Sequence, residues 1–523
     1  MSRIRKAAIT AGFAYGQFGV SIATGILMVP LTLHYVGARP WGLWLATGEL
    51  LGYAGMADLG VLGVLPWMIA EADGRQDRAA MRKFVGHGVW IGSAVSVAYA
   101  SISALLWLVL PSALRLSAPD RLLVLGPFAL LVALNAFSHP FRVFRATIGG
   151  LQDASFNGIL SIVHLLTTVG LTAALLVKGY GLFALAIGAG VPPFITFAAS
   201  IVRLRMIAPD LMSGWQRPTV AEARLLLTNG SGVWLGALGW QLLAATNAIV
   251  ITYLRHPEWV PIYNCTAKLS LMTTQLVWVL PDSALVGLAQ LYGERKDDVA
   301  RLRSVVLMLL RLHLLLAGAV ACGLLAFNPS FVTRWVGGQF FGGVLLNAFL
   351  AAGVVMYSLV HGLITTASVL GNRLKVGVVG FVNGVGQTVL AVLFGHWWGL
   401  PGVAAAGLLA AIVTSVPAGL TLLRPSTALS VRHLARELIG PWLVRAAAII
   451  ALAAAAGAFY ESLGLVLSAS IAAVIGAAYL WHMRPLYVEL PLDARWTERL
   501  VRIKLVPATA AAVAHPAAAL DQV

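Results

Sequence analysis

The sequence predicts an all-α integral membrane protein of about fourteen transmembrane helices, with two parallel six-helix bundles around a central cavity plus two C-terminal helices. Three observations predict this fold class: the composition, the spacing of apolar segments and the placement of basic residues. Hydrophobic residues make up 59% of the chain and charged residues 11%, so most side chains must face lipid or one another. Apolar segments of about 18 residues or more, enough to cross a membrane, recur along nearly the whole chain.

Basic residues then set the orientation of these segments. The net charge is +16, but most of the 36 lysine and arginine residues lie in short loops at alternate ends of the apolar segments, which does not indicate nucleic-acid binding. The positive-inside rule makes the basic loops cytoplasmic, so both termini are predicted inside. The predicted spans are 9–33, 43–69, 84–110, 122–141, 156–177, 181–202, 229–254, 260–287, 304–327, 341–369, 374–395, 399–422, 438–460 and 462–483.

An internal repeat organises the chain. In the loops after the second and eighth spans, identical residues lie 219 positions apart at Ala70 and Ala289, Gly74 and Gly293, and Arg82 and Arg301. A duplicated six-helix bundle accounts for this offset. The predicted domains are an N-terminal six-helix bundle over 1–204, a cytoplasmic linker over 205–224, a C-terminal six-helix bundle over 225–424, two additional helices over 425–485 and a partly disordered cytoplasmic tail over 486–523.

Ionisable residues inside spans cost roughly 2.5–3.5 kcal/mol each on insertion scales, so each is a functional candidate. The repeat places Glu49 and Lys268 at equivalent depths, where they could form an outer gate or simply find local partners. Asp58 lies nine residues after Glu49, on the opposite face of the predicted helix. It could bind a coupling cation or pair with an arginine that packs against it. Asp282, His139, His164, His313 and His361 lie in or at the ends of spans, where histidine is more often a packing residue than a proton carrier.

Arginines near the inner ends of spans suggest a cationic cavity. Arg311, with Arg142, Arg145 and Arg373, could bind a diphosphate, which guanidinium groups hold in a bidentate manner. With Lys268, they form the predicted substrate-binding set. The alternatives are that Arg311 extends to the membrane interface and that the other arginines only set the topology.

The sequence contains no credible nucleophile, phosphate-loop, ATPase or metal-site motif, and its two cysteines offer no metal-ligand spacing. We therefore predict no catalytic residue, metal site or cofactor. If the chain transports a substrate, the lack of an ATPase motif leaves an ion gradient, of Na⁺ or H⁺, or the gradient of the substrate itself to drive it.

The segments Pro30–Trp44 and Gly52–Gly60 resemble the Wzx-type polysaccharide flippases of the multidrug/oligosaccharidyl-lipid/polysaccharide exporter superfamily. The matching features are Pro-Leu, Tyr-Val-Gly and Gly-Leu-Trp in the first segment and Asp-Leu-Gly in the second, and the resemblance covers roughly residues 10–425. It implies alternating access in a bacterial inner membrane, with an undecaprenyl-diphosphate-linked oligosaccharide as cargo. Other polysaccharide-assembly membrane proteins are possible partners. The family often has an acid in the seventh span, where this chain has Asn247, so Asn247 joins Glu49 and Asp58 as a gating or ion-coupling candidate.

Three other classes remain open. A cation-coupled multidrug antiporter of the same superfamily would need a compact acidic site in one bundle. A major facilitator transporter is suggested by Gly74–Arg78, although the second glycine of that signature is missing. A membrane-embedded polysaccharide polymerase or ligase would carry catalytic groups on a long external loop, and every predicted outward loop here is short.

Overall fold

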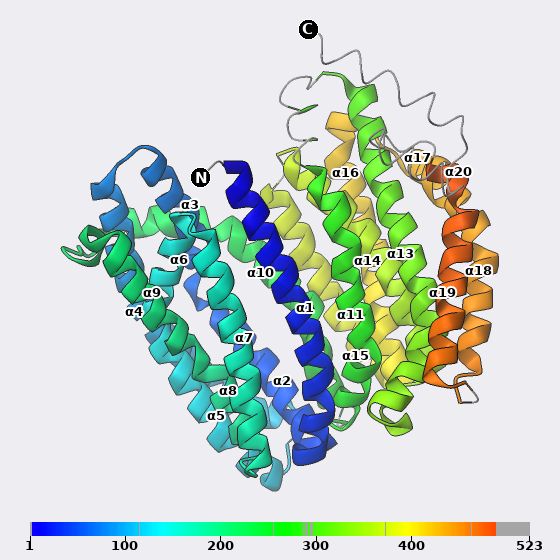
Figure 1. Cartoon of the computed structure of the whole chain (residues 1–523), viewed down its shortest axis with the longest axis horizontal. Helices are drawn as coiled ribbons and strands as arrows, with labels where there is room; N and C mark the ends of the chain where they lie inside the picture. Colours follow the sequence, from blue (N-terminus) through cyan, green and yellow to red (C-terminus); the bar gives the residue numbers. More distant parts are fainter. Residues whose placement is uncertain are drawn as a thin grey trace. The chain divides into compact units, whose positions relative to one another are not determined.

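The structure is a computed structural model that describes residues 3–487 except 115, 255, 286, 287, 289, 290, 293–296, 372 and 462. Within these residues every regular element is helical and no strand occurs, so the all-α prediction is confirmed (Figure 1). The chain forms two compact units. The first runs to Pro261 and includes Gly380–Thr388, and the second comprises Ile262–Val379 and the chain from Val389 onward.

The first unit contains all the elements up to α10. They are α1 (Arg3–Val36), α2 (Ala38–Ala54), η1 (Gly55–Asp58), α3 (Val61–Gly74), α4 (Arg78–Ala113), α5 (Ala118–Ser138), η2 (His139–Phe141), α6 (Arg142–Gly150), α7 (Ala154–Val177), α8 (Leu182–Gly190), α9 (Pro192–Ile207), η3 (Pro209–Met212) and α10 (Val220–Tyr253). The predicted cytoplasmic linker thus corresponds to the end of α9, η3 and the start of α10. Helix α10 packs with the N-terminal helices in the first unit. The domain boundaries inferred from the repeat stay a prediction.

The second unit contains the later elements. They are α11 (Trp259–Ser283, from Ile262), α13 (Val299–Trp335), η4 (Gly338–Phe340), α14 (Val344–Val369), α15 (Arg373–Ala410, except Gly380–Thr388), η5 (Ala411–Ser415), α16 (Val416–Thr427), α17 (Val431–His433), η6 (Leu434–Ile439), α18 (Gly440–Ala458), α19 (Leu465–His482) and α20 (Arg484–Tyr487). Most of the predicted tail over 486–523 lies outside the described residues.

Ten helices among the described residues are long and apolar enough to cross a membrane, or up to twelve if each bent pair is one span. Two features account for the difference from about fourteen predicted spans. The predicted spans 374–395 and 399–422 form one continuous helical stretch over Leu374–Thr427, which is kinked at Gly399. Helix α11, the predicted eighth span, is not among the apolar helices, and it carries Lys268 and Asp282.

The predicted second span is broken at the Asp-Leu-Gly sequence. The segments Ala38–Asp58 and Val61–Gly74 meet at an angle of 44°. Leu59 and Gly60 between them adopt positive φ angles of 48° and 79°. Gly60 is required here for a second reason, because a Cβ atom on it would lie 2.4 Å from the carbonyl oxygen of Gly230 in α10. The break therefore turns the chain and brings α10 against it.

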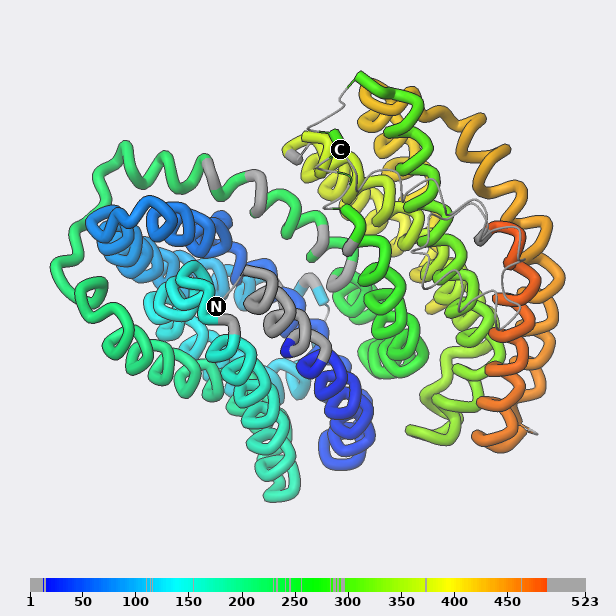
Figure 2. Tube along the Cα trace, turned by 45° about the horizontal axis from the view of Figure 1, so that its top comes forward, coloured from blue at the N-terminus to red at the C-terminus, as the bar shows by residue number. Residues whose placement is uncertain are grey.

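Helix α6, although only nine residues long, is held tightly against α3. Gly150 makes this possible, because a Cβ atom there would lie 2.8 Å from Ile69. Asp153 then starts α7 by accepting a hydrogen bond from the Phe156 amide, and it forms a 2.8 Å ion pair with Arg203 of α9. These contacts fix α3, α6, α7 and α9 around one another. Helix α1 runs beside α7 (Figure 2).

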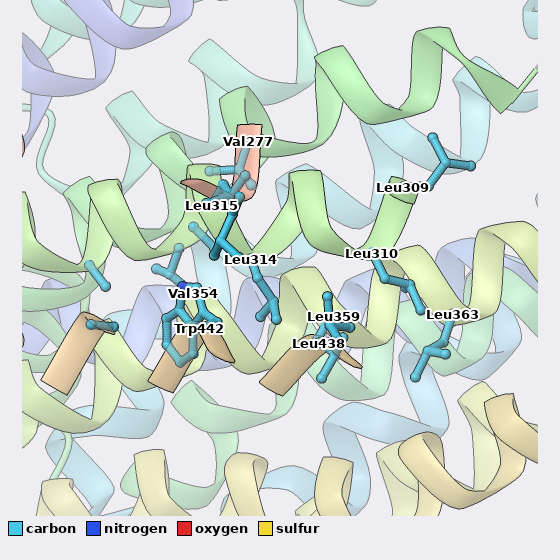
Figure 3. Close-up of a cluster of buried hydrophobic side chains, with 14 of the residues drawn as sticks. Val277, Leu309, Leu310, Leu314, Leu315, Val354, Leu359, Leu363, Leu438 and Trp442 are labelled. Carbon is cyan, nitrogen blue, oxygen red and sulfur yellow. The ribbon is translucent and has the colours of Figure 1, made fainter. Parts of the chain in front are cut away.

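Helix α13 is the centre of the second unit, where it packs against α14, α18 and α19. Figure 3 shows its leucines meeting those of α14 and η6, together with Trp442 of α18. Trp442 donates a 2.8 Å hydrogen bond to the hydroxyl of Tyr479 in α19. That hydroxyl also donates to the carbonyl of Leu314 at 3.4 Å. Because lipid provides no hydrophobic drive for helix association, such interhelical hydrogen bonds help hold the last two spans on α13.

Candidate functional site

The first unit contains a cavity of about 530 Å³. Its walls come from η1 and α3, the end of α5, α6, α7 and the start of α9. The lining residues are Asp58, Leu62, Pro66, Ser138, Arg142, Arg145, Ala146, Gly149, Asn157, His164, Pro193, Thr196 and Phe197. Three predicted site residues, Arg142, Arg145 and Asp58, therefore line the same cavity.

The two arginines lie near the end of the long helical stretch Ala118–Gly150. After Ser138 this stretch makes one turn of 3-10 helix over His139–Phe141, and α6 then begins at Arg142. Arg142 and Arg145 are three residues apart, so both side chains lie on one face of α6. Each is half-buried. The short helix thus carries two positive charges to the same wall.

Within the described part of the chain, neither guanidinium group has a carboxylate at ion-pair distance. Arg142 Nη2 donates to Ser138 Oγ at 3.5 Å, and Arg145 Nη2 donates to Ser161 Oγ at 2.7 Å. Among the described residues, no carboxylate oxygen lies within 4.0 Å of either arginine. Half-buried guanidinium groups without an acidic partner favour an anionic ligand, and their planar donors suit phosphate oxygens.

Asp58 contributes a negative charge to the cavity wall at the helix break. Its Oδ1 accepts a 3.1 Å hydrogen bond from the Gly60 amide, which holds the carboxylate at the turn between η1 and α3. Although Asp58 and Arg142 line the same cavity, they do not form an ion pair within 4.0 Å. The cavity therefore has two positive formal charges and one negative charge among its lining residues, with the acid available to respond to a cation or to a bound anion.

Helix α7 adds two polar residues, of which Asn157 was not identified from the sequence. Asn157 Oδ1 and His164 Nδ1 are buried and, in the described part of the chain, have no hydrogen-bond partner. Asn157, Ser161 and His164 are spaced by four and three residues, which places them on one face of α7. This polar stripe in an otherwise apolar helix was the available sequence signal. Unsatisfied buried polar atoms indicate a place for a ligand or water.

The remaining predicted substrate-binding residues belong to the second unit. Lys268 is half-buried in α11. Arg311 of α13 donates from Nη2 to the carbonyl of Glu437 in η6 at 3.1 Å, an interaction that gives it a local structural role. Arg373 begins α15, but its side chain lies outside the described residues. Their membership of one cationic cavity with Arg142 and Arg145 stays a prediction.

The two other gating candidates lie in the first unit. Glu49 is half-buried in α2, and within the described residues its carboxylate forms no ion pair. Its backbone carbonyl accepts from Gln241 of α10 at 3.4 Å. Asn247 lies further along α10 and is also half-buried. The proposed pairing of Glu49 with Lys268 joins residues of different units and stays a prediction.

Comparison with solved structures gives the class of the fold. The chain is similar to a lipid II flippase MurJ in an inward closed conformation, with a TM-score of 0.66 and 13% identity over 92% of this chain and 99% of that one. It is similar to an inward-facing multidrug resistance MATE family transporter of the MOP superfamily, with a TM-score of 0.56 and 14% identity over 78% and 96% of the two chains. A MOP superfamily transporter from Pyrococcus furiosus, described as having a binding pocket of reverse polarity, gives 0.54 and 16% over 80% and 96%.

The chain therefore has the fold of the MOP superfamily transporters and is a multi-pass membrane protein. At these identities the likeness is one of fold alone. Neither a protein-family model nor a curated protein sequence matches the chain.

Proposed function

We propose that this protein moves a polyprenyl-diphosphate-linked oligosaccharide from the cytoplasmic to the outer leaflet of a bacterial inner membrane by alternating access. The observation that carries the proposal is the pair Arg142 and Arg145 in a cavity of a transporter fold, with no acid within ion-pair distance in the described part of the chain. A diphosphate supplies the negative oxygens that two neighbouring guanidinium groups bind best.

In this mechanism Arg142 and Arg145 hold the diphosphate, while Asn157 and His164 offer further polar contacts from α7. Asp58 lines the same cavity, so a cation or proton at Asp58 would remove its repulsion of the bound anion and strengthen cargo binding. Asp58 is therefore our candidate for the residue at which Na⁺ or H⁺ acts. Glu49, Asn247 and Lys268 remain candidates for gating, and Arg311 and Arg373 for a wider cationic surface.

A multidrug antiporter of the same superfamily is the second candidate, favoured by Asp58 and by the similarity to MATE transporters. A cationic drug would be attracted to Asp58 but repelled by Arg142 and Arg145. Because two of the three charged residues lining the cavity are positive, an anionic cargo fits it better.

Depleting the protein in its native cells tests the proposal. If the protein is the flippase, complete lipid-linked oligosaccharide accumulates on the cytoplasmic face of the membrane, where added membrane-impermeant glycosidases cannot reach it. Accumulation of unpolymerised units on the outer face would instead indicate a polymerase or ligase defect. An unchanged lipid pool, together with increased sensitivity to cationic drugs, would support the antiporter.

A further inference from the structure

Three helices of the second unit bring together an acid and two histidines. Asp282 lies at the end of α11, His313 within α13 and His361 within α14. Each offers one ligand atom, and these three atoms all lie within 4.8 Å of one another. All three residues were noted in the sequence only singly, as polar groups in or near spans.

The Asp282 and His361 side chains already point toward one another. His361 Nε2 lies 3.0 Å from both carboxylate oxygens of Asp282. Trp278, one turn before Asp282 on α11, stacks on the His361 ring with the centroids 4.0 Å apart and an interplanar angle of 2°. The Trp278 indole in turn donates to Ser358 Oγ of α14 at 3.2 Å. The imidazole orientation is therefore fixed from two sides.

His313 is held with one ring nitrogen available. Its Nδ1 lies 2.9 Å from the carbonyl oxygen of Leu309, and because a carbonyl only accepts, Nδ1 must carry the proton. In the neutral ring Nε2 then has the lone pair, which is the form of imidazole that binds a metal. His313 is only 1% exposed, and its Nε2 has no hydrogen-bond partner among the described residues. Burying an unsatisfied acceptor is costly, which points to a missing ligand.

We propose that Asp282, His313 and His361 bind one divalent cation of the zinc class. Two imidazole nitrogens and one carboxylate oxygen are a ligand set typical of Zn²⁺ and Co²⁺, whereas Na⁺ and Mg²⁺ sites are built from oxygen atoms. Ligand atoms around a tetrahedral Zn²⁺, with bonds of about 2 Å, are separated by about 3.3 Å. The Asp282–His361 separation of 3.0 Å is already close to this, and the ion would replace the proton that His361 Nε2 donates to the carboxylate. The ligand atom of His313 lies within 4.8 Å of the other two, so it would have to move closer by up to about 1.5 Å, and a fourth position is left for water.

The burial of the three residues is uneven. His313 is only 1% exposed, whereas the side chains of His361 and Asp282 are 20% and 37% exposed. An ion could therefore enter from the side of Asp282 and be held against the buried His313. Binding would join α11, α13 and α14 within the second unit. The inference does not depend on the function proposed for the cavity of the first unit.

The test uses the full-length protein without a histidine tag, in lipid nanodiscs, after removal of metal with a chelator. Titration with Co²⁺ should give the visible absorption bands of a low-coordinate nitrogen and oxygen site, saturating at one ion per chain, and Zn²⁺ should displace the Co²⁺. Asp282→Asn, His313→Ala and His361→Ala should each weaken binding by at least about 10-fold, the lower limit even for groups that only support metal ligands. His396→Ala, at an exposed histidine of α15, should bind as the wild type does.

Trp278 provides a local readout. Co²⁺ quenches nearby indole fluorescence, so Trp278→Phe should remove the metal-dependent quenching while Co²⁺ absorption persists. Asp282→Asn keeps the side-chain shape and one oxygen that can accept from His361, so without metal the variant should still unfold cooperatively, only slightly below the wild-type temperature, which separates lost ligation from lost folding. Absence of saturable Co²⁺ binding, or binding that none of the three ligand substitutions weakens, would overturn the assignment.

Discussion

In the first unit Arg142 and Arg145 line a cavity, and no carboxylate of the described residues lies within ion-pair distance of them. In the second unit Asp282 lies within hydrogen-bond distance of His361, beside a buried His313. The first arrangement favours an anion and the second a cation. Among the described residues, the first unit thus has two guanidinium groups without a carboxylate partner, whereas the second has an unpaired imidazole nitrogen of His313 beside a carboxylate.

The largest expected effect is the loss of anion binding in the first unit. Arg142→Ala and Arg145→Ala should each weaken binding of a short-chain polyprenyl diphosphate by roughly 2–5 kcal/mol, the cost of removing one partner of a desolvated charge pair. Binding to purified protein in nanodiscs and flipping in proteoliposomes would measure this. Lysine at either position should lose less, because it keeps the charge but not the bidentate geometry.

Arg205→Ala is the matched control, since Arg205 is exposed in the last turn of α9 and does not line the cavity. None of these substitutions should change Co²⁺ binding in the second unit. If the alanine variants of Arg142 and Arg145 bind and flip the polyprenyl diphosphate as the wild type does, the two arginines are not an anion site.

The next effect is structural and should be confined to the first unit. Gly60→Ala places a side chain where φ is 79° and where a Cβ atom would lie 2.4 Å from the Gly230 carbonyl oxygen. A cost of about 1–3 kcal/mol is expected from such a strained position. Thermal unfolding would report it, and displacement of Asp58 should impair flipping. Gly48→Ala, whose Cβ would meet nothing within 4 Å, should be neutral; equal behaviour of the two variants would contradict the role of the break.

A smaller effect is expected at Asp58 itself. Asp58→Asn removes the negative charge from the cavity wall, so diphosphate binding should tighten by on the order of 1 kcal/mol while dependence of flipping on the ion gradient is lost. Binding titrations and transport with dissipated Na⁺ or H⁺ gradients would separate the two effects. Weaker binding in this variant would mean that Asp58 supports the arginines and does not oppose the anion.

The smallest effect is expected at the surface, at the start of α10. The pKa of Glu222 is lowered to about 2, most strongly by a hydrogen bond from Lys83 and less strongly by hydrogen bonds from the Thr219 backbone and hydroxyl. Because this pKa is lower than the value of 4.5 in the unfolded chain, the ionised carboxylate stabilises the fold at pH values above 4.5. This stabilisation is lost as the pH falls toward 2. Glu222→Gln should therefore be less stable than the wild type at neutral pH, and the difference should shrink in acid. A stability difference between the two proteins that grows in acid would contradict a stabilising role of the ionised Glu222.

Much of the fold could be predicted from the sequence, because hydropathy and basic loops directly report the membrane. Arg142 and Arg145 could also be predicted as site residues, since charged residues near the ends of apolar spans are easily recognised in a sequence. The sequence could not indicate that Asp58 and Arg142 line the same cavity, because this depends on the break at Leu59 and Gly60 and on the packing of α6 against α3. Similarly, Asp282 and His361 are 79 residues apart, and only the packing of α11 beside α14 brings them together.

The size of the cavity has a consequence for what the protein would discriminate. A volume of about 530 Å³ is enough for a compact group such as a diphosphate, whereas a polyprenyl oligosaccharide is far larger. On the proposed function, the contacts of this cavity would recognise the phosphate groups, and most of the glycan would lie outside them. Such a carrier would tolerate changes in later sugars, and selectivity for a complete repeat unit would have to arise in the enzymes that build and consume it.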